Sequence, residues 1–199
     1  MPKRLPLVAV DYGSRTAGTT VLVHRDPHPD GPLAFVASAK KQDADALVAD
    51  TLARLGPAAV FFDAPLSLPG VYRDLPGFDD FHHRRGDREV NAMSPMFLGG
   101  LTARAMKLAA RFPDHHWHET YPAAQADRLG LPRGRYKKDP AALTEFTAAL
   151  ADHLDARFDP AAVTTWHHFD ALLAYVAAER FASGQHRQIG DPAEGVIVV

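Results

Sequence analysis

The sequence predicts a mixed α/β domain with a five-stranded sheet, in which three antiparallel strands precede parallel ones and helices flank the sheet. Three observations indicate this class. Three short apolar segments joined by turns open the chain, apolar residues then recur at helical spacing, and another apolar segment follows that helix. Short turns favour antiparallel pairing, whereas a strand–helix–strand connection implies parallel pairing within one sheet.

Turn residues separate the first three predicted strands, and one helical segment precedes the fourth. The first is an apolar stretch that begins at Leu7 and ends in the carboxylate of Asp11. From Asp43 onwards, apolar residues lie on one helical face until Gly56-Pro57 stops the helix. The strand that follows ends in a second carboxylate, Asp63. The expected strands are residues 7–11, 19–24, 33–39, 59–63 and 115–119.

The helices are predicted from caps and apolar stripes. Ser94 as N-cap and Pro95 as first helical residue open one helix, with a break at Gly99-Gly100. The last long helix buries an apolar stripe that includes Leu173, and Asp170 shares this face three residues earlier. The expected helices are residues 43–55, 94–112, 122–129, 140–158 and 164–183.

Composition bounds the class of protein. The 199 residues fit one domain, residues 1–199, with a Pro-rich and charged loop inserted at about 64–93. The absence of cysteine excludes disulfides, thiolate zinc sites and a cysteine nucleophile. The formal net charge of −2 means that nucleic-acid binding would need a local basic patch. No apolar run is long enough to span a membrane, so a cytoplasmic location is expected. Residues 196–199 are expected to form an edge strand.

Four acids stand at strand ends or on a core-facing helical stripe. They are Asp11, Asp63, Glu119 and Asp170. Carboxylates gathered at one sheet edge repel one another unless a cation neutralises them, and oxygen ligands suit Mg²⁺ or Mn²⁺. Two such ions about 4 Å apart would stabilise the attacking and leaving oxygens of a phosphoryl displacement. The alternatives are turn capping for the strand-end acids, a surface ion pair for Glu119, and a buried arginine partner for Asp170.

The element order, with acids on the first strand, the fourth strand and the last helix, is that of the ribonuclease H-like fold. The chain resembles a family of predicted ribonuclease H-like nucleases classed as a domain of unknown function, family four hundred twenty-nine. The matching segments are Val10-Asp11-Tyr12-Gly13, residues 62–68, residues 85–95, Glu119-Thr120-Tyr121-Pro122, residues 170–174 and residues 190–197. His167-His168 stand where that family often has an additional acid. The resemblance implies a metal-dependent nuclease in which all four acids are catalytic and bind metal.

Basic residues and histidines supply the remaining candidates. Phosphate binding is assigned to Arg15, Arg85, Arg88 and Lys137, with surface solvation as the alternative for each. His118, His167 and His168 are candidate proton shuttles, with a structural role as the alternative.

The leading hypothesis is a hydrolase that cleaves DNA or RNA with two metal ions. One alternative is a catalytically weak or inactive ribonuclease H-like binding module, favoured by the lack of overall positive charge. Another is a phosphotransferase of the actin-like superfamily, although 199 residues leave no room for its second domain. The sequence leaves strandedness, endo- or exonucleolytic cleavage and oligomeric state open.

Overall fold

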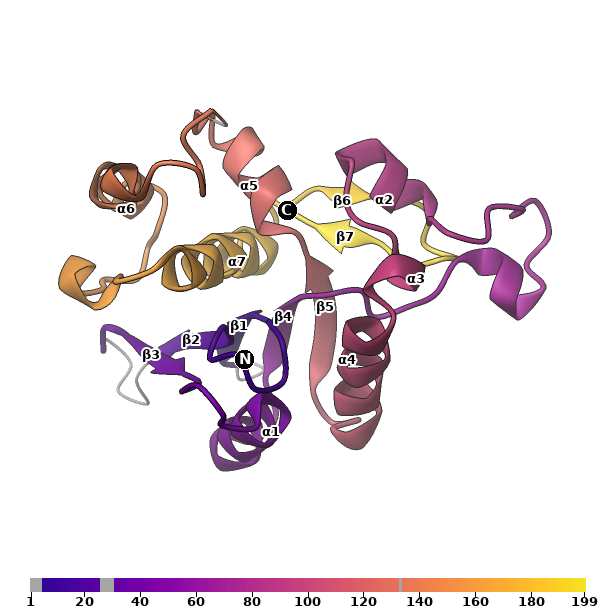
Figure 1. Cartoon of the computed structure of the whole chain (residues 1–199), viewed down its shortest axis with the longest axis horizontal. Coiled ribbons are helices and arrows are strands. Elements are labelled where there is room, and N and C mark those ends of the chain that lie inside the picture. Colours follow the sequence, from indigo (N-terminus) through magenta and orange to yellow (C-terminus); the bar gives the residue numbers. More distant parts are fainter. Residues whose placement is uncertain (1–4, 26–30, 133) are drawn as a thin grey trace.

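The computed structural model, which describes residues 5–25, 31–132 and 134–199, has a seven-stranded mixed sheet in the order β3-β2-β1-β4-β5-β7-β6 (Figure 1). Residues 26–30 of the turn between the second and third strands lie outside this part of the chain. The strands are β1 (Leu7–Asp11), β2 (Val21–Arg25), β3 (Leu33–Ala37), β4 (Ala59–Asp63), β5 (His116–Thr120), β6 (Gln188–Ile189) and β7 (Ile197–Val198).

The five predicted strands are present, and their pairing is as expected. β1, β2 and β3 pair antiparallel, whereas β1, β4 and β5 pair parallel. The prediction of five strands was nevertheless wrong, because β7 pairs parallel with β5 and β6 pairs antiparallel with β7. The C-terminal segment was expected at the sheet edge, yet β7 lies inside the sheet. The strand expected over 196–199 is thus present as β7, whereas the two residues of β6 have too little periodicity to be predicted from sequence.

Helices cover both faces of the sheet. The α-helices are α1 (Ala44–Leu55), α2 (Arg85–Val90), α3 (Pro95–Leu98), α4 (Gly100–Arg111), α5 (Pro122–Arg128), α6 (Leu143–Ala151) and α7 (Trp166–Ala182). The 3₁₀ helices are η1 (Gly70–Arg73), η2 (Pro140–Ala142) and η3 (Pro160–Ala162). No helix in the described ranges combines the length and apolarity needed to cross a bilayer.

Two apolar clusters form the core, one on each face of the sheet. α7 packs with Ala9 and Phe61 on one face, together with buried side chains of α5 and α6. α1 and α4 pack with Val10 and Phe62 on the other face. Val10 follows Ala9 directly, and Phe62 follows Phe61, so the side chains of each pair point to opposite faces, as strand alternation requires. α7 is buried along most of its length, as expected for a helix that is apolar on nearly all sides.

The break predicted within the helix over 94–112 is present, and another predicted helix is shorter than expected. Gly99, with a φ of +45°, ends α3 before α4 begins. The helix expected over 140–158 begins as η2 and ends as α6 at Ala151. Beyond that point, the backbone N–H groups of Asp155 and Ala156 donate to the Glu179 carboxylate. These contacts with α7 replace the next helical turn.

The segment predicted as an inserted loop, residues 64–93, is folded and firmly attached. It contains η1 and α2, and Arg84 within it is one of the largest fully buried side chains. The C-terminal tail packs closely against it. Gly195 has a φ of +115°, and a Cβ there would lie 2.3 Å from Ser67 Oγ, so only glycine fits. The segment projects at the right of Figure 1.

Candidate functional site

Strand alternation places Asp11 and Asp63 together on the face of the sheet that α7 covers. The two residues are direct partners in the parallel β1–β4 ladder. Asp11 lies two residues after Ala9 in β1, and Asp63 lies two residues after Phe61 in β4. Ala9 and Phe61 both belong to the core on the α7 side of the sheet. Side chains two residues apart on a strand share a face, so both carboxylates point towards α7 at the carboxyl ends of their strands.

α7 supplies the third carboxylate, Asp170, which is fully buried. Its Oδ1 accepts a hydrogen bond from the Tyr136 hydroxyl, and its Oδ2 forms an ion pair with Lys137 Nζ. Oδ2 has no further donor among the described residues. Lys137 has a φ of +60°, so the loop after α5 turns sharply at this position. The loop therefore places a cation directly against the carboxylates.

A histidine from the first turn of α7 completes the charged cluster. His167 Nδ1 lies 2.8 Å from Asp11 Oδ2, and this ring is 42% exposed. The hydrogen bond to Asp11 raises the pKa of His167 above its ordinary value, although burial acts in the opposite direction. We call Asp11, Asp63 and Asp170 the carboxylate cluster; Lys137 and His167 are its two cationic neighbours.

The carboxylate cluster favours protons or cations. The pKa of Asp63 lies well above its ordinary value because of desolvation and the nearby charges of Asp11 and Asp170. Burial, followed by the charge of Asp11, raises the pKa of Asp170 to about 7. Burial would lower the pKa of Lys137, but the charge and hydrogen bond of Asp170, together with the charges of Asp11 and Asp63, outweigh it and the pKa is raised. The buried carboxyl groups of the cluster thus retain protons more readily than exposed ones do, and a cation could take the place of those protons.

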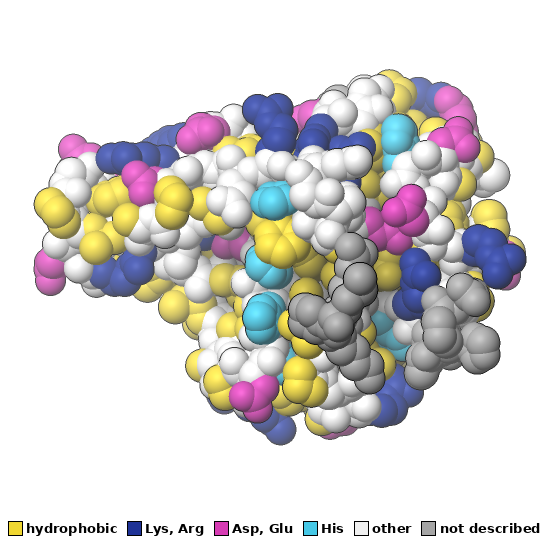
Figure 2. All heavy atoms as spheres, turned by 180° about the vertical axis from the view of Figure 1, so that it is seen from behind, with side chains coloured by type: hydrophobic (Ala, Val, Ile, Leu, Met, Phe, Trp, Pro, Cys, Tyr) yellow, Lys and Arg dark blue, Asp and Glu magenta, His cyan; other side chains and the backbone are white. Residues whose placement is uncertain are grey.

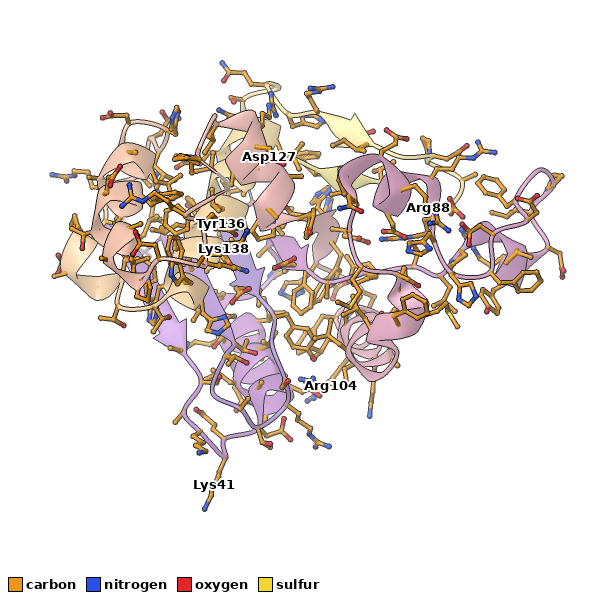
Figure 3. All side chains as sticks on the ribbon, turned by 45° about the horizontal axis from the view of Figure 1, so that its top comes forward. Lys41, Arg88, Arg104, Asp127, Tyr136 and Lys138 are labelled. Atoms are coloured by element: carbon orange, nitrogen blue, oxygen red, sulfur yellow. The ribbon has the colours of Figure 1, made fainter. Side chains whose placement is uncertain are left out.

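A cavity of about 490 Å³ opens beside Asp63. Its wall includes Tyr136, Lys137 and Lys138 from the loop after α5, and Asn91 from the insert. Figure 3 labels Tyr136 and Lys138 on that loop. The cavity is large enough for a phosphate with part of its sugar or base, and it gives solvent a route to an otherwise buried cluster.

Glu119 does not belong to the carboxylate cluster, which corrects the expectation of four convergent acids. It pairs in register with Phe62 of β4, so it lies on the sheet face covered by α1 and α4. Its carboxylate binds Arg84 through a 2.6 Å contact with Nη1, and it accepts a hydrogen bond from the backbone N–H of Leu66. Arg84 also binds Asp87 at 2.6 Å. Glu119 therefore anchors the insert.

Of the four residues predicted to bind phosphate, the structure places one at the carboxylate cluster. Lys137 lies there, whereas the others are held in ion pairs elsewhere. Arg15 pairs with Asp43, Arg85 with Asp191, and Arg88 with Asp80.

The other two candidate histidines contact aromatic rings or polar groups outside the cluster. His118 stacks on Phe61 with a centroid distance of 4.8 Å, and burial lowers its pKa. His168 Nδ1 lies 2.8 Å from the hydroxyl of Thr165, the N-cap of α7. Figure 2 shows histidine side chains gathered on the side turned away from the view of Figure 1. Of the three candidates, only His167 is therefore placed to exchange a proton with the cluster.

Sequence reasoning missed Tyr136, Asn91 and Arg84. Tyr136 stands beside Lys137 in a basic segment, and nothing in the local pattern links it to α7. Asn91 has a φ of +53° and so ends α2, a cap that asparagine tolerates better than most residues. Arg84 stands in a run of charged residues, a pattern that is typical of a solvated loop. A signal did exist there, because Asp87 three residues later suits a helix N-terminus.

The donor set of the carboxylate cluster suits a hard divalent cation, although its present arrangement does not enclose one. Its three carboxylates offer only oxygen, which Mg²⁺ and Mn²⁺ prefer. Within the described ranges, no group of three or more His, Asp or Glu side chains has the spacing to hold an ion. In this arrangement the ammonium group of Lys137, rather than a metal ion, pairs with the Asp170 carboxylate.

No protein-family model, curated protein or solved structure significantly matches this chain.

Proposed function

We propose that this protein is a metal-dependent hydrolase of phosphodiester bonds in DNA or RNA, built on a ribonuclease H-like fold. One observation carries the proposal: Asp11, Asp63 and Asp170 come from β1, β4 and α7 and meet beside an open cavity. The core order β3-β2-β1-β4-β5 and the resemblance of the motifs to the ribonuclease H-like family support the same assignment.

The carboxylate cluster would hold Mg²⁺ or Mn²⁺ through its oxygens, with three acids rather than the four expected. A bound ion of this kind activates water and stabilises charge on a phosphoryl group. Lys137, displaced from Asp170, would then be free to pair with a phosphate oxygen across the cavity. His167 would hold a proton at Asp11 and is exposed enough to exchange it with solvent. Lys138 adds a second cation to the cavity wall.

A second candidate is a binding module that retains this fold without catalysis. The ion pair of Lys137 with Asp170 and the hydrogen bond of His167 to Asp11 favour it, because together they partly neutralise the cluster without metal. The two candidates differ in one measurable property. A hydrolase must bind a divalent ion through these carboxylates, whereas a binding module need not.

The test is calorimetric titration of the purified protein with Mn²⁺, alongside incubation with mixed-sequence oligonucleotides. Wild type should bind Mn²⁺ and cleave, and Asp11→Asn should lose both. Asp50→Asn is the matched control, since it makes the same charge change at an exposed position on α1. Binding that is absent, or unchanged in Asp11→Asn, would rule out the proposed metal site. Binding without cleavage would favour the binding module.

A further inference from the structure

The large apolar side chains that remain exposed in the described ranges are concentrated in and just after the insert. They are Tyr72 (45% exposed), Phe81 (56%), Met93 (60%) and Phe97 (68%). We call these four residues the aromatic surface. Figure 2 shows hydrophobic side chains on the projecting end at the left, which is the right-hand end in Figure 1. Scattered exposed apolar residues need no explanation, but a concentration in one short segment indicates a binding surface.

Contacts connect the aromatic surface into one unit. Tyr72 and Phe81 meet edge to face at 5.9 Å, and the Tyr72 hydroxyl donates to the Phe81 carbonyl. The next residue, His82, lies against the Phe97 ring at 5.4 Å. The Ser94 hydroxyl donates to the His82 carbonyl and also caps α3. The rings therefore share one continuous support.

Buried charge keeps this support rigid. Arg84 lies between Asp87 and Glu119, and all three are at least nine-tenths buried. The Glu194 carboxylate accepts hydrogen bonds from the backbone N–H groups of Gly70 and Arg85, at 2.7 and 2.8 Å. These contacts fasten the insert to β5 and to the C-terminal tail. Buried contacts therefore hold the insert that carries the exposed rings in place before any ligand arrives.

The chain segment that lines the cavity leads into the aromatic surface. Asn91 lines the cavity together with Asp63, and Met93 follows two residues later in the sequence. Ser94 and Phe97 come next along the chain. One short segment therefore supplies a wall residue of the cavity and two side chains of the aromatic surface.

Positive charge accompanies the rings of the aromatic surface. Arg85 and Arg88 are paired with aspartates. Arg73, next to Tyr72, is exposed, and its guanidinium donates to a backbone carbonyl. Lys138 adds a cation at the wall of the cavity. Exposed rings beside cations fit single-stranded nucleic acid, whose bases stack on aromatic side chains regardless of sequence.

We propose that the aromatic surface stacks unpaired nucleobases, so that the substrate of the carboxylate cluster is single-stranded nucleic acid. This inference rests on the proposed function. Duplex base pairs hide their faces against one another, and only unpaired bases can lie on Phe97 and its neighbours. The rings position the substrate rather than take part in catalysis, because none of them touches the carboxylate cluster.

The test measures fluorescence anisotropy of a labelled single-stranded oligonucleotide and its duplex, in EDTA so that nothing is cleaved. We expect wild type to prefer the single strand. Phe97→Ala and Phe97→Leu should weaken that binding by about 5- to 150-fold, the range for one stacked base, and Phe97→Trp should retain it. Binding of the duplex should not change among the variants. Phe97 is 68% exposed, so these substitutions leave the fold intact.

Leucine separates the two explanations of an exposed apolar surface. If Phe97→Leu binds the single strand as wild type does, the surface does not act by stacking, and a protein partner becomes the better assignment. No wild-type preference for the single strand would also overturn the inference. Cleavage in Mn²⁺ is scored separately on both oligonucleotides. A nuclease that cuts only duplex would disprove this inference and support the proposed function, whereas stacking without cleavage would do the reverse.

Discussion

Metal binding at the carboxylate cluster should strengthen as pH rises from 6 to 8, because the metal competes with protons for the same oxygens. Asp170 has a pKa of about 7, and the pKa of Asp63 is also raised. At pH 6 about a tenth of Asp170 is ionised, and at pH 8 about nine tenths. One proton displaced per ion therefore raises the apparent affinity about tenfold, or about 1.4 kcal/mol. Displacement of a second proton from Asp63 would make the increase steeper.

The same shift fixes the sign of the stability change without metal. The folded pKa of Asp170 lies above its ordinary value of 3.8, so the folded state binds this proton more tightly than the unfolded state. The free energy of unfolding of the metal-free protein should therefore fall as pH rises from about 4 to about 7. Mn²⁺ should oppose this loss most strongly above pH 7, where it no longer displaces a proton.

The assay is calorimetric titration with Mn²⁺ at pH 6, 7 and 8, in pairs of buffers with different ionisation enthalpies. The buffer dependence of the heat counts the protons released. We expect close to one proton, or more, per ion at pH 6 and fewer at pH 8. Asp170→Asn should reduce the pH dependence to the part that Asp63 contributes, and Asp50→Asn should preserve it in full. An affinity that is constant from pH 6 to 8, with no proton released, would refute the assignment of Asp170 and Asp63 as ligands.

Two further predictions concern the cations of the site and of the insert. Lys137→Met should raise the affinity for Mn²⁺ by about fivefold, because it removes a half-exposed ammonium group worth about 1 kcal/mol that competes for Asp170; calorimetry at pH 8 measures this. The same variant should cleave more slowly, and unchanged Mn²⁺ affinity would contradict the competition. Arg84→Met should lower the free energy of unfolding by about 3–5 kcal/mol in urea, since it leaves Glu119 buried without its partner. Arg88→Met, which breaks an exposed pair, should cost at most about 1 kcal/mol, and equal losses in both variants would contradict the difference in burial.

The sequence predicted the elements that depend on local pattern. Apolar runs bounded by turn residues identified β1 to β4, and capping residues identified the start of α3 and the end of α1. β5 was predicted from a short strand-like run of histidines and Trp117 that ends in an acid. The sequence could not identify β6, because two residues carry no period. The buried role of Arg84 was missed for a different reason. A charged residue in a charged run looks solvated until the tertiary fold brings Glu119 to it from a distant strand.

The carboxylate cluster was predicted in part, and the part that failed has a simple geometric cause. Asp11 and Asp63 are each the fifth residue of a five-residue strand, and the two strands pair in register from their first residues. Glu119 is the fourth residue of its strand, and it pairs with Phe62 rather than Asp63. One residue of offset turns a side chain to the opposite face of a sheet.

An acid at a strand end is therefore insufficient evidence for a shared site. The face that each acid occupies depends on its distance along the strand from residues that pair with each other. Phe61 pairs with His118; Asp63 lies two residues after Phe61, whereas Glu119 lies one residue after His118, so the two acids occupy opposite faces. Asp170 joins the cluster because α7 packs on the face to which Asp11 and Asp63 point, and a side chain of this helix can reach only acids on that face.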